Sequence, residues 1–213
     1  MSTENTACGG RGGVCGTAKG GLYRQKERNI ADEKGREHKI LKLCLAEALI
    51  RMMQEQSYES INISAVCERA GVGRTTYYRH FDTKGGKEEL LVFKLVSEWQ
   101  AFAEKHREEK EKDWTKVFLN YVYENRELLR LMYRSGLVTA IMRAFDELSD
   151  WKEEKNSAYL RAFFVYGFFG VVYQWIRYDF DETPEQIVRH TAEAVLHAAQ
   201  ERAWQQAGAE NGG

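Results

Sequence analysis

The sequence predicts an all-α fold of about nine helices, and three observations support that prediction. Pro184 is the single proline among 213 residues, and proline interrupts helices more strongly than any other residue. Several long segments repeat apolar residues at helical spacing, whereas no segment alternates apolar and polar residues as a half-buried strand does. Hydrophobic residues make up 43% of the chain, which is enough for a substantial core. The predicted arrangement is an N-terminal three-helix head followed by a C-terminal helical body.

The N-terminal segment, residues 1–36, is rich in Gly, Thr and Ser and has few large apolar side chains. Such a composition buries too little apolar surface to offset the entropy of ordering, so this segment is predicted to be a disordered tail. Its second half, from Lys19 to Arg36, is basic, and basic arms can follow a minor groove or a phosphate backbone. A solvated tail is the favoured interpretation, and an expression leader or a misassigned start codon is also open.

The head is predicted to span residues 37–87, and its first helix runs from Glu37 to Gln56. This helix is amphipathic and packs behind two shorter helices. Those helices lie between Asn62 and Phe81, on either side of the turn Gly71-Val72-Gly73. Asn62 is placed to cap the first short helix, and Gly71 is placed to end it as a C′ glycine. Two short helices joined by a glycine-containing turn form a helix-turn-helix motif.

The second short helix is crowded with hydrogen-bond donors. An arginine fork matches guanine in the major groove, and hydroxyl and imidazole groups can reach phosphate oxygens. A solvated polar helix in some other bundle is the alternative interpretation of this composition alone. The donors are Arg74, Thr75, Thr76, Tyr77, Tyr78, Arg79 and His80.

This stretch resembles the DNA-binding segment of the TetR family of transcriptional regulators. The family pattern is an apolar helix, Ala-Gly-Val, a cap, a Thr, two aromatic residues and His-Phe, followed by Lys-Glu-Glu-Leu-Leu. The resemblance covers residues 40–91 and rests on a specific motif. The matching residues are Ala70-Gly71-Val72, Gly73, Thr76, Tyr77-Tyr78, His80-Phe81 and Lys87 to Leu91.

The resemblance implies a role for each matched position. Arg74 and Thr75 are the implied base-reading residues, Tyr77 and Phe81 are implied to lie in the core, and double-stranded DNA is the implied partner. The chain departs from the family at two of these positions, since the family often has Thr where Asn62 stands and Ser where Gly73 stands. The remaining DNA-binding candidates, most of them for phosphate contacts, are Asn62, Gly73, Thr76, Tyr78, Arg79, His80 and either Lys84 or Lys87.

The chain departs from the family pattern between the head and the next helix. Gly85-Gly86-Lys87 reads as an insertion of roughly three residues, judged against the usual short family linker. Family members place one lysine at the start of this helix on a phosphate, and the sequence leaves open whether Lys84 or Lys87 takes that contact. Two glycines are also expected to soften the joint between head and body.

The body is predicted to span residues 88–206, with residues 207–213 as a loose tail. The run from His106 to Lys112 is heavily charged and is predicted to be a solvated helix end and loop. Thr183-Pro184 is a strong helix start, with Thr as the cap and Pro at the first helical position. The predicted body helices are 88–105, 116–123, 126–134, 137–155, 158–178 and 184–205.

The resemblance implies that this body dimerises and binds a small-molecule effector. Residues 158–178 and 184–205 are implied to form a four-helix interface, so that two heads can read a palindrome. The high density of aromatic residues suits a hydrophobic or aromatic effector, although the same rings could simply be core. The candidate pocket residues are Trp99, Phe102, Tyr121, Tyr133, Phe145, Phe163 and Tyr166.

Charge and cysteine content add weaker indications. The formal net charge is −1, but residues 19–94 carry 15 Lys and Arg against 11 Asp and Glu, whereas the remainder from residue 95 carries 15 against 20. A basic N-terminal part suits a head that approaches nucleic acid. Cys44 and Cys67 are expected to be small buried hydrophobes, and Cys8 and Cys15 do not match a zinc-site spacing. A cytoplasmic protein with reduced thiols is expected, without an export signal or membrane span.

Enzymatic motifs are not found in the sequence. A glycine-rich phosphate loop, a nucleophile elbow and a two-histidine metal helix are all missing, so no enzyme activity, cofactor or metal is expected. His190 and His197 lie seven residues apart and are interpreted as core or interface residues. The predicted function is a homodimeric DNA-binding regulator, most often a repressor in this family, that a small molecule releases. The alternative is a co-regulator of the same fold that docks a protein partner instead of reading DNA.

Overall fold

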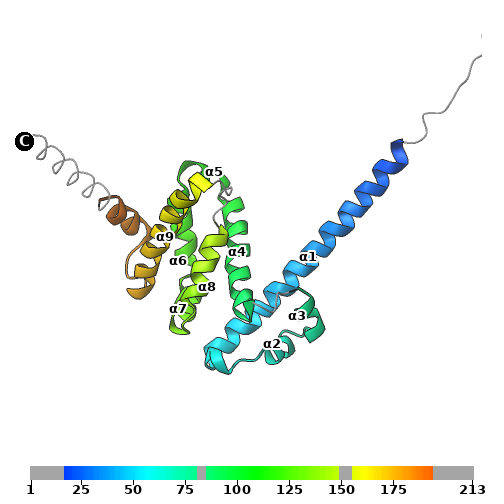
Figure 1. The fold of residues 1–213 in the computed structure, drawn as a ribbon, viewed down its shortest axis with the longest axis horizontal. Coiled ribbons are helices and arrows are strands. Elements are labelled where there is room, and N and C mark those ends of the chain that lie inside the picture. Colours follow the sequence, from blue (N-terminus) through cyan, green and yellow to red (C-terminus); the bar gives the residue numbers. More distant parts are fainter. Residues whose placement is uncertain (1–16, 81–84, 149–154, 194–213) are drawn as a thin grey trace, which may run out of the picture. The chain divides into compact units, whose positions relative to one another are not determined.

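The computed structural model describes residues 17–80, 85–148 and 155–193. Every regular element in these residues is a helix, so the predicted all-α fold is confirmed. Residues 184–193 are also helical. In chain order (Figure 1) the elements are α1 (Thr17–Glu55), η1 (Tyr58–Ser60), α2 (Ile63–Arg69), α3 (Arg74–His80), α4 (Glu88–Lys105), α5 (Arg107–Lys112), α6 (Trp114–Glu124), α7 (Arg126–Arg134), α8 (Val138–Leu148) and α9 (Lys155–Arg177).

The chain divides into two units, residues 1–41 and residues 42–213. The first unit contains the N-terminal part of α1, which begins at Thr17, whereas the sequence predicted a disordered tail as far as residue 36. The difference has a physical reason. The segment from Thr17 onward contains Arg, Lys, Gln, Glu and Ala and no proline, and these residues have good helix propensity. The small number of apolar residues indicates little tertiary packing for this segment, but helix propensity does not depend on such packing.

In the second unit, α2 and α3 pack against the C-terminal part of α1 and form the head (Figure 1). Cys67 is buried as expected, but Cys44 is exposed. Cys44 comes one position before the buried Leu45, and one residue turns a helix by about 100°, away from the core. The buried residues of the head are Leu45, Ala46, Ala48, Leu49, Ile50, Met52, Met53, Ile61, Val66, Cys67 and Tyr77.

The turn between α2 and α3 has the predicted capping geometry. The side-chain oxygen of Asn62 accepts a hydrogen bond of 2.9 Å from the Ala65 amide, which caps α2. Gly71 has a φ of +67°, the left-handed conformation that a C′ glycine adopts at low cost. The next amide, that of Val72, donates to the Cys67 carbonyl at 2.9 Å. The turn is therefore held by backbone hydrogen bonds on both sides of one required glycine.

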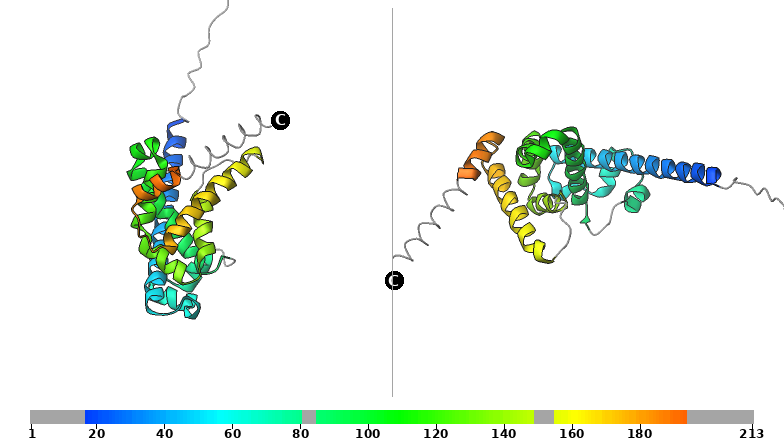
Figure 2. Two further views of the ribbon diagram at one scale, coloured as in Figure 1. Left: turned by 90° about the vertical axis from the view of Figure 1, so that its left-hand side faces the viewer. Right: turned by 90° about the horizontal axis from the view of Figure 1, so that it is seen from above.

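The body is built around α4, which packs along α8 and also contacts α6 (Figures 1 and 2). The hydroxyl of Tyr121 in α6 donates a buried hydrogen bond of 2.6 Å to the Leu95 carbonyl of α4, and burial raises the pKa of that hydroxyl. Arg143 of α8 donates to the Glu89 carboxylate at the start of α4. These two links, together with buried leucines on α4, fix α4 against its neighbours.

The predicted and observed helix boundaries of the body agree in part. The observed bounds of α4 and α7 coincide with the predicted ones, whereas α6, α8 and α9 differ from the predicted bounds at their ends. Residues 107–112 form α5 instead of the predicted loop. Arg107 and Glu111 lie four residues apart in sequence, and their side chains are 3.6 Å from each other. Opposite charges at this spacing stabilise a helix, so the charged composition that had indicated a loop instead supports α5. No helix of the described part is both long and apolar enough to cross a membrane.

Candidate nucleic-acid interface and ligand pocket

The helix α3 presents one polar face and buries one aromatic side chain. Arg74, Thr75, Tyr78 and Arg79 are exposed, because residues at i, i+1, i+4 and i+5 share one side of a helix. Tyr77 faces the other way and is 3% exposed, with its hydroxyl 3.3 Å from the Gly86 carbonyl. The burial of Tyr77 agrees with the core position that the resemblance implied.

The exposed arginines of α3 differ from the neighbouring Arg69. Arg69 donates two hydrogen bonds of 2.5 Å to the two carboxylate oxygens of Glu55, and this bond lowers the pKa of Glu55. Arg69 therefore ties α2 to α1. In contrast, Arg74 and Arg79 form no ion pair with any carboxylate of the described residues. Their guanidinium groups are free to form a bidentate contact with an external acceptor.

The other predicted contact residues on the head occupy varied positions. Asn62 is exposed, but its side-chain oxygen is used to cap α2, so only its amide N–H groups are left for an external acceptor. Gly73 precedes α3, and its carbonyl accepts from the Thr76 amide at 2.9 Å. Thr76 is half-buried. His80 is the last residue of α3, and Lys84 lies outside the described residues.

Lys87 is half-buried, and its ammonium is turned toward the protein rather than toward solvent. Its ammonium donates to the Tyr58 carbonyl, and to the Ile61 carbonyl at 2.5 Å. It also lies 4.1 Å from the centroid of the Tyr58 ring, and burial lowers the pKa of Lys87. Since two carbonyls and an aromatic face already surround this ammonium, Lys87 joins the start of α4 to the connection that follows α1.

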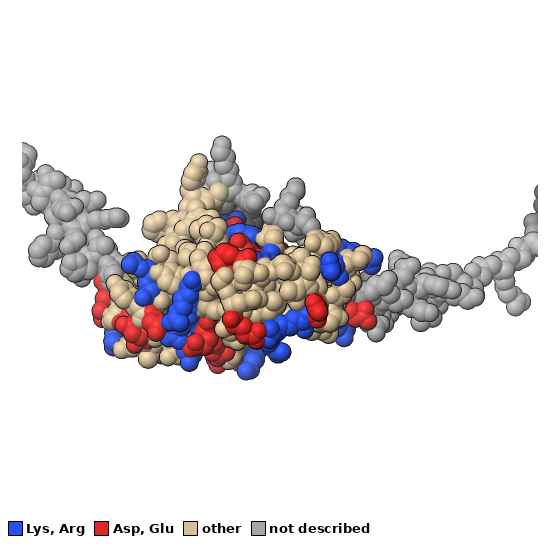
Figure 3. All heavy atoms as spheres, turned by 90° about the horizontal axis from the view of Figure 1, so that it is seen from below, with Lys and Arg blue, Asp and Glu red and all other residues tan. Residues whose placement is uncertain are grey.

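Charged side chains of both signs are interspersed on the face shown in Figure 3. A broad field of one sign attracts DNA over a long range, and this face does not present one. Attraction to phosphates on this face therefore depends on individual donors.

A second link joins head and body through α4. Lys94 lies 2.5 Å from Glu47 of α1 and 2.5 Å from Glu98 of α4. Its side chain is 11% exposed. Burial opposes the charge of Lys94, but the two carboxylate hydrogen bonds outweigh it and raise the pKa. This buried cation was not singled out in the sequence, because nothing in the sequence indicates that positions 47 and 94 are neighbours.

The body contains an aromatic cavity of about 540 Å³, which we call the aromatic pocket. Trp114 stacks on Phe118 with ring centroids 4.9 Å apart, and Phe118 lies 5.4 Å from Phe168. A volume of this size is within the usual range for small-molecule sites. The lining residues are Trp99, Lys110, Trp114, Thr115, Phe118, Phe145, Leu148, Phe164, Val165 and Phe168.

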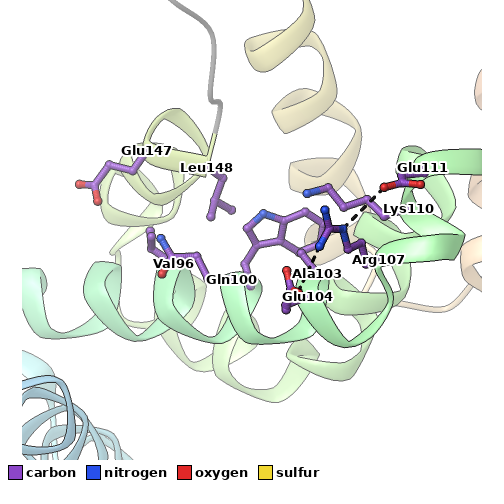
Figure 4. Close-up of a pocket in the computed structure, with 10 residues that line it drawn as sticks. Val96, Gln100, Ala103, Glu104, Arg107, Lys110, Glu111, Glu147 and Leu148 are labelled. Carbon is purple, nitrogen blue, oxygen red and sulfur yellow. Dashed lines mark ion pairs between the residues drawn. The ribbon is translucent and has the colours of Figure 1, made fainter. Parts of the chain in front are cut away.

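A charged cavity of about 610 Å³ adjoins the aromatic pocket. Its charged side chains come from α4, α5 and the end of α8 (Figure 4). Arg107 lies 3.7 Å from Glu104 and 3.6 Å from Glu111, and burial raises the pKa of Glu147. The two cavities share Trp99, Lys110 and Leu148.

The structure brings two of the seven pocket candidates into the aromatic pocket, Trp99 and Phe145. Phe102 and Tyr121 line a separate hollow of about 360 Å³. The other three candidates lie elsewhere: Tyr133 packs edge-on to Tyr173, and Phe163 and Tyr166 are exposed on α9. Sequence reasoning did not select Lys110, because it assigned this residue to a solvated helix end and loop. In a helix, Lys110 lies one turn after His106, and that position would have indicated a side chain directed at α4.

The described residues contain no group of His, Cys, Asp and Glu side chains that could hold a metal ion. His190 is exposed, with its Nδ1 atom 2.9 Å from Glu182. His197, Cys8 and Cys15 lie outside the described residues.

Comparison with known proteins gives two family matches. The family model of bacterial regulatory proteins of the tetR family matches residues 45–92, which cover α2, α3 and the start of α4. A second family model, described as a transcriptional regulator C-terminal region, matches residues 109–196, which cover most of the body. A search of curated proteins found no match.

Proposed function

Because this chain belongs to the TetR family of DNA-binding transcriptional regulators, we propose that it is a homodimeric repressor that a small apolar effector releases from a palindromic operator. Regulators of this family generally have no enzymatic activity, and we propose none here. The observation that carries the proposal is the set of unpaired donors on the exposed face of α3.

In this proposal Arg74 and Thr75 read base edges in the major groove. Both are exposed at the start of α3, and it is the N-terminal residues of a recognition helix that contact base edges. Tyr78, Arg79 and the amide group of Asn62 contact phosphates. Lys84 is the phosphate lysine in this proposal, since the ammonium of Lys87 is already held by two carbonyls.

The proposed dimer interface is the outer face of α9 together with the helical stretch from residue 184. Phe163 is 73% exposed and Tyr159 is 79% exposed, so α9 presents large apolar side chains to solvent. Monomeric proteins seldom leave a contiguous apolar patch of this kind uncovered. A second copy related by a two-fold axis would cover the same residues on both chains. The exposed apolar residues of α9 are Tyr159, Leu160, Phe163, Phe164 and Tyr166.

The proposed release mechanism depends on α4, which contacts both functional regions. Trp99 of α4 lines the aromatic pocket. Lys94, five residues before Trp99 in α4, and Lys87, twelve residues before it at the N-cap of α4, both contact the head. An effector that displaces Trp99 would shift α4, and these two lysines would carry that shift to the head. The separation of the two heads in the dimer would then no longer match the operator.

The experiment that tests this function is binding of the purified protein to the DNA upstream of its own gene, in a salt series with non-specific competitor. Tight binding that resists competitor and weakens steeply with salt supports an operator-reading dimer. Weak binding that competitor abolishes supports the alternative co-regulator, and affinity capture with the same protein would then be used to identify a protein partner.

A further inference from the structure

We propose that the effector is a singly charged anion with a flat apolar body, which packs among the rings of the aromatic pocket and places its anionic group on the Lys110 ammonium. The ligand's role as an effector rests on the proposed function, whereas its binding site follows from the residues of the aromatic pocket. It specifies the ligand by charge and shape.

The walls of the aromatic pocket select an apolar and preferably planar ligand body. Trp99 lies 4.9 Å from Phe118 and 6.1 Å from Trp114, in edge-to-face contacts. Phe168 completes the cluster at 5.6 Å from Trp114. A ring inserted among these side chains gains both buried apolar area and edge-to-face contacts.

Among the residues that the structure describes, Lys110 is the single charged one that lines the aromatic pocket. It extends from α5, where it is half-buried, and its ammonium lies 5.8 Å from the centroid of the Trp99 ring. The aliphatic part of a lysine packs on apolar surface while its charged end seeks a polar partner. A ligand that supplies one negative charge would satisfy that end at the edge of the ring cluster.

The nearby carboxylates pair with Arg107, which leaves the Lys110 ammonium available to bind an anionic group of a ligand. Arg107, on the same helix, is placed between Glu104 and Glu111, as Figure 4 shows. Lys110 forms no ion pair with a carboxylate of the described residues. Its strongest described interaction is the contact with Trp99, and an anion would add a charge-assisted hydrogen bond to this half-buried group.

The same arrangement argues against other ligand charges. A cation would meet the Lys110 ammonium in the aromatic pocket, and like charges at close range are repelled. A ligand with two or more negative charges would have to extend into the adjoining cavity, where Glu104, Glu111 and Glu147 outnumber Arg107 and where Arg107 already lies between Glu104 and Glu111. One negative charge is therefore the best match to the two cavities together.

The test is isothermal titration calorimetry of the full-length protein with three matched probes: 2-naphthoate, 2-naphthamide and 2-naphthylmethylammonium. The carboxylate is expected to bind the wild-type protein about tenfold or more tightly than the neutral amide, and the cation is expected to bind most weakly. In Lys110→Met, which keeps an unbranched apolar side chain but removes the ammonium, carboxylate and amide are expected to bind equally. Lys110→Arg is expected to retain the preference for the carboxylate.

Lys112→Met is the matched control, since Lys112 is an exposed lysine of α5 outside the lining of both cavities. It is expected to bind all three probes like the wild type. Equal binding of carboxylate and amide to the wild type, or a carboxylate preference that persists in Lys110→Met, would overturn the proposal. Failure of the carboxylate to bind at about 1 mM, where binding free energy is near −4 kcal/mol, would overturn it as well.

Because calorimetry contains no DNA, its outcome is separate from that of the proposed function. Binding of the carboxylate without any effect on operator affinity would support the pocket and contradict effector release. Operator binding by a protein that ignores all three probes would support the DNA reader and contradict the assigned ligand class.

Discussion

The ammonium of Lys94 in α4 lies 2.5 Å from a carboxylate oxygen of Glu47 in α1. The Lys94 side chain is 11% exposed, whereas that of Glu47 is 46% exposed, so the pair spans the boundary between interior and solvent. Glu98 of α4 holds the same ammonium from the other side at 2.5 Å. The Lys94–Glu47 pair is therefore one of the links between α4 and the head, and Glu98 holds the same ammonium from within α4.

Glu47→Gln is expected to weaken the communication between pocket and head without unfolding the protein. Glu98 still pairs with Lys94, and the Glu47 side chain is 46% exposed, so the loss of stability should stay within about 1 kcal/mol. The ratio of operator Kd values with and without a bound ligand should move toward one. Anisotropy titrations with labelled operator measure this ratio. Glu68→Gln makes the same charge change on an exposed residue of α2, and an equal effect of both variants would contradict a specific role for Glu47.

Arg74→Ala is expected to reduce affinity for the cognate operator by about 1–3 kcal/mol, because a base-reading guanidinium is removed. The thermal midpoint should not change, since Arg74 is exposed and forms no described ion pair. Arg134→Ala is the control, because Arg134 is an exposed arginine at the end of α7, 3.8 Å from Asp179. A fall in affinity of the same size in both variants would argue against readout by α3.

Lys84→Met and Lys87→Met are expected to separate a phosphate contact from a structural one. Each lost phosphate contact lowers the salt slope of binding by about 0.9, so a dimer without Lys84 should lose roughly two units. Lys87→Met should keep the wild-type slope and instead lower stability by about 1–3 kcal/mol, because two carbonyls lose a buried donor. The measurements are Kd against salt concentration and urea unfolding. The reverse pattern would assign the phosphate contact to Lys87.

Gly71→Ala is expected to destabilise the protein by about 1–2 kcal/mol, since φ at this position is +67° and a Cβ atom is strained there. Nothing lies within 4 Å of the added atom, so the cost is backbone strain alone. Gly73→Ser is the matched change on the other side of the turn. Its Cβ would lie 3.7 Å from the Thr76 hydroxyl, an ordinary contact, and serine caps a helix slightly better than glycine. Urea unfolding that ranks Gly73→Ser below Gly71→Ala would contradict this account of the turn.

Phe163→Glu is expected to convert the dimer to a folded monomer. Phe163 is 73% exposed in the single chain, so the charge costs little there, but a two-fold interface would bury two carboxylates close together. Sedimentation velocity measures the species, and circular dichroism checks that helix content is retained. Thr139→Glu introduces the same charge on an exposed position of α8 and should remain dimeric. A dimeric Phe163→Glu would place the interface elsewhere.

The part of the fold that sequence predicts best is the helix-turn-helix. Asn62, Gly71 and the apolar spacing of α2 are local signals, and each depends on residues within one or two turns. The observed α2 and α3 accordingly begin and end where those signals stand. The burial of Tyr77 is equally local, because it faces away from the polar side of a short helix.

The features that sequence did not predict depend on contacts between distant positions. The sequence left open which of Lys84 and Lys87 contacts a phosphate, and only the fold shows that the Tyr58 and Ile61 carbonyls lie within reach of the Lys87 ammonium. Lys110 was assigned to a solvated loop, since its neighbours are charged, and only the packing of α5 near Trp99 brings it to the pocket. Aromatic residues were candidates by type, but helix orientation decides whether a ring faces a cavity, as with Phe145, or the exposed side of α9, as with Phe163.

The residues that line the aromatic pocket and the residues that hold the head lie largely on different helices, and this separation affects how the ligand specificity of the chain can change. Trp99 is the single residue of α4 that lines the aromatic pocket, whereas the other nine lining residues come from α5, α6, α8 and α9. Substitutions at those nine positions can retune the ligand while the lysines that hold the head stay unchanged. A library randomised at Thr115, Phe145 and Val165 would therefore search for sensors of new compounds that still recognise the original operator.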